Sequence, residues 1–171
     1  MSQFNTLASY LGRLVTIETL VSFSVLAVIT YLLRGRLALL FKLSNWKAIW
    51  LGWSICGVLA FTIRFWDSNG FNPVPWFLHF DEWQQIYIYS ASWLLNVALF
   101  IPAGILLTAF GKRFWASLAG LLGFSTVIEL FQQYTKYGIG DPSDFTANAL
   151  GAAIGLGIGL LVRMLQNVRA N

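Results

Sequence analysis

The chain has 171 residues, of which 57% are hydrophobic and 11% charged; its mean hydropathy is +0.67 and its formal net charge +4. Soluble domains carry roughly 25% charged residues, so this composition excludes a soluble globular protein and indicates a single transmembrane domain over residues 1–171. The basic residues are scattered in short loops rather than gathered on one face, so the positive charge does not indicate nucleic-acid binding.

Long apolar runs follow one another along the chain and predict an all-α, polytopic membrane protein with about five transmembrane helices. A helical span needs roughly 20 residues, and the runs are continuous rather than alternating, which excludes the strands of a membrane barrel. The first run is too long for a cleaved signal peptide. The five predicted helices cover Val15–Leu33, Ala48–Phe65, Ile86–Phe110, Phe114–Tyr134 and Phe145–Leu165.

The distribution of basic residues predicts the orientation of the five helices. Cytoplasmic loops of membrane proteins are enriched in Lys and Arg, and the N-terminus is therefore expected outside and the C-terminus in the cytoplasm. Tryptophan and tyrosine residues flank the runs, as expected at the membrane interfaces. The flanks assigned to the cytoplasm carry Arg34, Arg36, Lys42, Lys47, Lys112, Arg113, Arg163 and Arg169, and the opposite flanks carry Arg13, Arg64 and Lys136.

A group of polar residues interrupts the last two apolar runs. An acidic side chain at the centre of a membrane helix costs about 2.5–3.5 kcal/mol even on the lenient insertion scale, so it indicates a functional site by default. A short loop joins the two runs, which makes them antiparallel neighbours with their polar faces at similar depth. We expect the second of them to begin near Ser143 or Asp144, either of which is an acceptable N-cap. The group consists of Glu129, Gln132, Asp141, Asp144 and Asn148.

Other features are expected to bring the helices together around this group. Gly151, Gly155 and Gly159 recur every four residues and allow a partner helix to approach closely. Asn96 adds a polar group in the outer half of the third predicted helix, and Pro102 is expected to kink that helix. We therefore predict a polar pocket in the outer leaflet, formed by the last three helices.

The segment between the second and third predicted helices carries His79, Asp81 and Glu82 among aromatic and proline residues. It is expected to lie on the outer membrane surface. One histidine with two nearby acids lacks the spacing of zinc ligands, and the sequence contains no phosphate loop, nucleophile elbow or cofactor fingerprint. We expect no metal and no cofactor.

The polar motifs resemble those of the VanZ-like membrane proteins. Asn96-Val-Ala-Leu-Phe-Ile-Pro-Ala-Gly resembles the family's N-x-x-x-F-x-P-x-G stretch. The sequences from Ile128 to Gln132, from Asp141 to Asp144 and from Asn148 to Gly151 resemble its E-x-x-Q, D-x-x-D and N-x-x-G motifs. The resemblance covers residues 86–160. It implies a membrane protein of the cell envelope, since the namesake is associated with low-level resistance to the glycopeptide teicoplanin.

The residues themselves leave three classes of function open. The first is a non-enzymatic envelope protein whose pocket binds a lipid-linked envelope precursor, a glycopeptide or a partner helix. The second is a membrane-embedded enzyme on a lipid-linked substrate, with Glu129 and Asp144 as acid and base. The third is a small proton-coupled transporter with Glu129 as the titrating group. We favour the first, because no nucleophile or metal set accompanies the acids.

Each polar residue also has a purely structural interpretation. Glu129 with Gln132, and likewise Asn96, can hold helices together by hydrogen bonds, and Asp141 and Asp144 can cap a helix. We expect a multi-pass protein of the cytoplasmic (inner) membrane that contacts membrane lipid and no nucleic acid; the sequence leaves the oligomeric state open.

Overall fold

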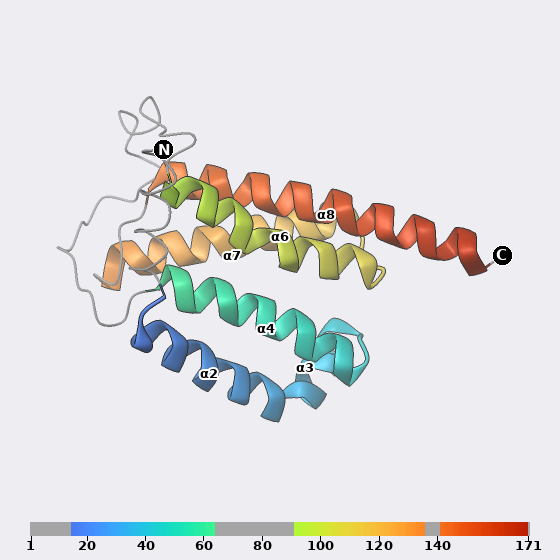
Figure 1. Cartoon of the computed structure of the whole chain (residues 1–171), viewed down its shortest axis with the longest axis horizontal. Coiled ribbons are helices and arrows are strands. Elements are labelled where there is room, and N and C mark those ends of the chain that lie inside the picture. Colours follow the sequence, from blue (N-terminus) through green and yellow to red (C-terminus); the bar gives the residue numbers. More distant parts are fainter. Residues whose placement is uncertain (1–14, 64–90, 136–140, 171) are drawn as a thin grey trace.

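The computed structural model describes residues 15–63, 91–135 and 141–170, and within these ranges every regular element is a helix (Figure 1). The all-α prediction is therefore confirmed for the described part of the chain. Two helices, α2 and α3, meet at an angle of 71°, so they form at most one broken span. The helices are α2 (Ile17–Leu32), α3 (Arg34–Phe41), α4 (Asn45–Thr62), α6 (Ala91–Ala109), α7 (Phe114–Thr135) and α8 (Pro142–Ala170).

Three of these helices, α6, α7 and α8, are long and apolar enough to cross a membrane, and the bent pair α2 and α3 makes a fourth candidate. The protein is thus a membrane protein with three to four candidate spans by length and composition. The predicted helix Ala48–Phe65 corresponds to α4. This helix is 18 residues long, but it carries Asn45, Lys47 and three tryptophans and falls short of the others in hydropathy.

The short helix α3 replaces a segment that was expected to be a loop. Its leucine, alanine and arginine residues are good helix formers, so the basic charge alone does not break the chain. The helix ends at Lys42, whose backbone is left-handed with φ 50° and whose N–H is directed at the carbonyls of Ala38 and Leu39. The turn at Lys42 sends the chain back along α2 as α4.

Helices α6 and α8 form the tightest interface in the described structure. They run parallel, because Gly151, Gly155 and Gly159 of α8 lie against the carbonyl groups of Val97, Ile101 and Ile105 of α6 in the same order. A Cβ atom at any of the three glycines would collide with the facing backbone. The missing side chains therefore allow the close approach of the two backbones.

Pro102 lies inside α6, and the helix continues through it without a break. The hydroxyl of Thr108, the residue before the last in α6, lies 2.9 Å from the carbonyl oxygen of Leu156 in α8 and 3.2 Å from that of Gly104. Because Thr108 is fully buried, this hydroxyl adds a polar link to an otherwise apolar contact.

The core lies where α4, α6, α7 and α8 meet. Its members come from all four helices: Val58, Phe100, Ala103, Leu121, Ile128, Ala152 and Leu156. Many large apolar side chains on α2 and α8, among them Val21, Val28, Leu161 and Met164, are exposed instead. Such exposure suits helices whose outer faces contact lipid.

The two ends of the helical bundle differ in charge. We call the end that holds Lys42, Lys47, Lys112 and Arg113 the basic end; it contains α3 and the turn between α6 and α7 (Figure 1). We call the opposite end, where α7 ends and α8 begins, the polar end. The described acids of these two helices, Glu129, Asp141 and Asp144, all belong to the polar end.

Candidate functional site

Helix α8 begins at the polar end with Pro142, and Asp141 is its N-cap. The Asp141 carboxylate accepts a hydrogen bond of 2.7 Å from the backbone N–H of Ser143, and its carbonyl accepts bonds from Asp144 and Phe145. Proline at the first helical position has no N–H to leave unpaired, which favours this start. The predicted N-cap at Ser143 or Asp144 is therefore two or three residues too late. Asp144 instead lies in the first turn, where a negative charge faces the positive end of the helix dipole.

Glu129 of α7 is joined to this helix start. Its Oε2 atom accepts a hydrogen bond of 3.1 Å from the backbone N–H of Asp141, and the residue is 1% exposed. In a capping box, an acidic side chain of the same helix takes the N–H of the N-cap residue. Here Glu129 does so from the neighbouring helix. The Asp144 carboxyl group lies close enough to interact electrostatically with Glu129, so three carboxyl groups gather at this level.

A second level of polar contact lies one turn further into the bundle. The Nδ2 atom of Asn148 donates a hydrogen bond of 2.9 Å to the hydroxyl of Ser125, and both residues are buried. Ser125 precedes Glu129 by four residues and Asn148 follows Asp144 by four, so the two levels are about 6 Å apart along the helices. We call the contacts of Glu129 with Asp141 and of Ser125 with Asn148 the two polar tiers.

The second tier contains an unusual acceptor. The Oδ1 atom of Asn148 is buried, and no donor for it is present among residues 15–63, 91–135 and 141–170. A buried acceptor without a partner costs about 1–3 kcal/mol, and native structures contain few of them. This atom is thus suited to accept a hydrogen bond from a bound molecule.

Two predicted site residues lie apart from the tiers. Gln132 is buried on α7, but its Nε2 atom donates a bond of 2.7 Å to the carbonyl of Thr62 at the end of α4. It therefore joins α7 to α4 and not to α8. Asn96 is half-buried on α6, next to Val97 at the level of Gly151, and the described ranges offer its side chain no hydrogen-bond partner.

Sequence reasoning missed two residues of this region. Ser125 could have been found from its spacing, since it lies one helical turn before Glu129 on the same face. Thr146 was missed too; its hydroxyl lies 3.3 Å from the indole nitrogen of the buried Trp93 of α6, which donates to it. This bond fixes the start of α8 against the start of α6.

No group of three or more His, Cys, Asp or Glu residues suited to a metal ion occurs among the residues that the structure describes. The segment with His79, Asp81 and Glu82, which was predicted to lie on the membrane surface, is outside the described residues, and so is Lys136.

Comparison with known protein families shows which family the chain belongs to. The model of the VanZ/LLP1 family matches residues 53–163, which is more than half of the chain. The chain belongs to this family. The match confirms the resemblance inferred from the motifs, and it begins earlier than expected, inside α4. No curated protein and no solved structure matches the chain.

The matched region places the two polar tiers within the VanZ/LLP1 part of the chain. It contains α6, α7 and α8 as far as Arg163, and it therefore includes every residue of both tiers. Helices α2 and α3 lie before it. The protein is thus a VanZ-like membrane protein whose two polar tiers belong to the family region.

Proposed function

We propose that this VanZ-like protein lies in the cytoplasmic membrane of the cell envelope and binds a lipid-linked or peptidoglycan-related ligand at its polar tiers. In this proposal the binding contributes to tolerance of glycopeptides such as teicoplanin. The observation that carries the proposal is the Oδ1 atom of Asn148, a buried acceptor with no donor in the described residues, one turn from three carboxyl groups. Sugar and peptide groups of envelope precursors supply hydroxyl and amide donors for such an acceptor.

The ligand is proposed to enter from the outer leaflet, which requires five crossings with the polar end outside. In support, α2, α4, α6, α7 and α8 lie side by side and alternate in direction along the chain, and α4 ends and α6 begins at the same end of the bundle (Figure 1). Helix α4 is not among the helices that are long and apolar enough to cross a membrane, but it packs between α2 and α6. Neighbouring helices can shield its polar groups from lipid.

Reporter fusions test this topology. Fusions after Arg34, Lys112 and Asn171 are expected to read cytoplasmic, and a fusion after Asn69 extracytoplasmic, because basic flanks stay inside. The measurement is paired alkaline phosphatase and green fluorescent protein activity at each site, normalised to protein level. An extracytoplasmic signal after Asn171 would contradict the proposal, because five crossings from an N-terminus outside place the C-terminus in the cytoplasm.

Ligand binding is tested by the melting temperature of the purified full-length protein in detergent. A lipid-linked disaccharide-pentapeptide precursor at a hundredfold excess over Kd should raise Tm by about 5 °C or more. Teicoplanin is a second probe. Asn148→Leu should abolish the rise, because it removes the Oδ1 acceptor.

Ser125→Ala is the matched control for Asn148→Leu. Both variants lose the hydrogen bond between α7 and α8, and both should lower the basal Tm. Only Ser125→Ala retains the acceptor of Asn148, so only this variant should keep the rise with ligand. Equal loss in both variants would show that the helix contact matters rather than the acceptor, and no rise in the wild type with either probe would refute the proposed ligands.

A further inference from the structure

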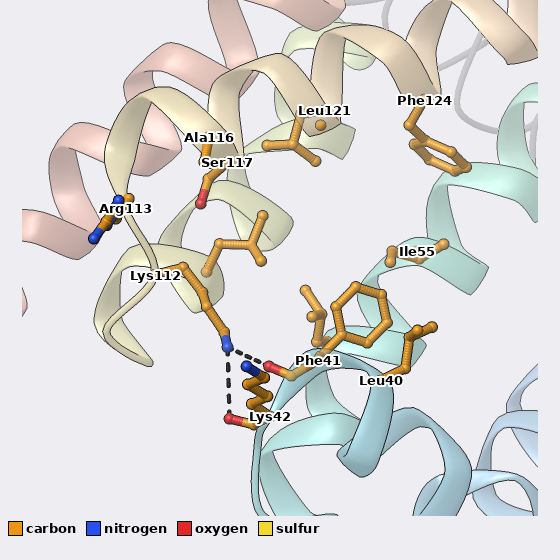
Figure 2. A pocket seen from close by; sticks show the side chains of 13 residues that line it. Leu40, Phe41, Lys42, Ile55, Lys112, Arg113, Ala116, Ser117, Leu121 and Phe124 are labelled. Atoms are coloured by element: carbon orange, nitrogen blue, oxygen red, sulfur yellow. Dashed lines mark hydrogen bonds between the residues drawn. The ribbon is translucent and has the colours of Figure 1, made fainter.

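A cavity of about 570 Å³ opens at the basic end, between α3 and α4 on one side and α6 and α7 on the other. Its walls are apolar, with Phe41, Ile55, Leu107, Leu121 and Phe124 among the lining residues. Figure 2 shows Lys112 and Arg113 on one side of this cavity and Phe124 and Ile55 on the other. The cavity is therefore amphipathic along its length, with cations at one end and aromatic and aliphatic side chains at the other.

The length of the cavity matches one membrane leaflet. Its lining follows α7 from Arg113 to Phe124, which is about 16 Å at the rise of an α-helix. The hydrocarbon core of a bilayer is about 30 Å thick, so one leaflet is about half of that. A molecule that reaches from the basic residues to Phe124 thus extends from the headgroup level to near the centre of the membrane.

The basic side chains at the mouth of the cavity differ in whether a bound anion can reach them. The Nζ atom of Lys112 donates to the carbonyls of Phe41 and Lys42 at the end of α3, so this charge is engaged in holding α3 against the α6–α7 turn (Figure 2). Lys42 and Arg113 are exposed, and Arg113 directly precedes the first residue of α7, where the helix dipole also favours an anion. Two exposed cations therefore line the cavity next to the start of α7.

We propose that this cavity binds one anionic phospholipid of the adjacent leaflet, with an acyl chain along α7 and the phosphate at Lys42 and Arg113. Apolar side chains line the cavity at the depth of the lipid tails. At this depth an acyl chain, rather than water, is available to fill it. Basic pockets between membrane helices recognise anionic headgroups by charge. This site is separate from the polar tiers and does not depend on the function proposed for them.

Two glycines of α7 provide a test of the acyl-chain position. A Cβ atom at Gly120 or at Gly123 would meet no other atom within 4 Å, but only Gly120 lines the cavity. Gly120→Leu should therefore fill the cavity without disturbing the helices, and Gly123→Leu is the matched control. Full-length protein is placed in nanodiscs of equal parts phosphatidylglycerol and phosphatidylcholine with identical acyl chains, and the lipid retained after release is counted by native mass spectrometry.

The wild type and Gly123→Leu should retain one phosphatidylglycerol in preference to phosphatidylcholine, and Gly120→Leu should retain at least about fivefold less. Size-exclusion chromatography checks that each variant is monodisperse. Retention by Gly120→Leu equal to that of Gly123→Leu would overturn the proposal. A wild type that carries no lipid would overturn it as well, including the case in which a second copy of the chain occupies the cavity and a dimer appears instead.

The headgroup contact is tested by charge removal. Lys42→Gln with Arg113→Gln should reduce the preference for phosphatidylglycerol by about 25-fold, because each of the two lost charges is worth roughly fivefold near the membrane surface. Arg36→Gln with Lys47→Gln removes the same charge from exposed residues of the basic end that do not line the cavity, and it should leave the preference nearly unchanged. Equal losses in the two double variants would show that the preference reflects overall charge, which would overturn the assigned phosphate position.

Discussion

Gly155→Val should greatly reduce the amount of folded protein in the membrane, whereas Gly157→Val two residues later should be nearly silent. A Cβ atom at Gly155 would collide with the carbonyl group of Ile101 on the backbone of α6, and a Cβ atom at Gly157 would meet nothing within 4 Å. Added bulk in a tight core typically costs 1–3 kcal/mol, and here about 3 kcal/mol or more is expected because the facing atoms are backbone and cannot change rotamer. The helix propensity of valine is the same at both positions.

The measurement for this pair is membrane abundance by immunoblot together with Tm in detergent. Gly155→Ala refines it, because a single methyl group already reaches the Ile101 carbonyl, so a smaller loss in the same direction is expected. Equal Tm values for Gly155→Val and Gly157→Val would contradict the parallel packing of α6 on α8. That packing sets the depth of α8 relative to α6, whereas the two polar tiers join α8 to α7 through separate contacts.

The apolar runs predicted the long helices because their physical cause is local. A continuous apolar stretch bounded by polar residues has no other way to satisfy its backbone in a membrane, and the predicted Phe114–Tyr134 differs by one residue from α7. The errors arose where local signals compete. The charge around Arg36 predicts a loop, but the leucine, alanine and arginine residues of this segment also have a high helix propensity. The segment forms the helix α3. Asp141 and Asp144 are both good caps, and Pro142 decided between them.

For each contact of the candidate site, the sequence predicts one of the two residues but not its partner. Glu129 and Asn148 stand out because acids and amides are rare in apolar helices. Their partners stand out less. The spacing places Ser125 on the same face as Glu129, but a serine commonly bonds the carbonyl four residues before it in its own helix, so the spacing alone does not show a contact with another helix. The partners of Glu129 and Gln132 are the backbone groups of Asp141 and Thr62, which any residue provides. Tertiary structure alone supplies this information.

The charges of the first polar tier are expected to matter for function more than for folding. Asp144→Asn keeps the size of the side chain and a polar atom in the first turn of α8, and Glu129→Gln keeps an oxygen that can accept the bond from the N–H of Asp141. Each variant loses only the ability to carry a negative charge. If the tiers bind an envelope ligand through that charge, both variants should abolish the protein's effect on teicoplanin susceptibility at unchanged abundance.

Glu129→Leu separates this role from helix packing. It removes the acceptor and leaves the N–H of Asp141 without its partner on α7, at a cost of about 1–3 kcal/mol, so abundance and Tm should fall whichever role is correct. The decisive comparison is Glu129→Gln, measured as teicoplanin susceptibility against protein level in cells that express each variant. A purely structural glutamate predicts wild-type susceptibility for Glu129→Gln, because a neutral amide accepts the same bond. Wild-type behaviour of both Glu129→Gln and Asp144→Asn, with a loss in Glu129→Leu alone, would refute the charged site and leave the first tier as the contact that fixes α8 on α7.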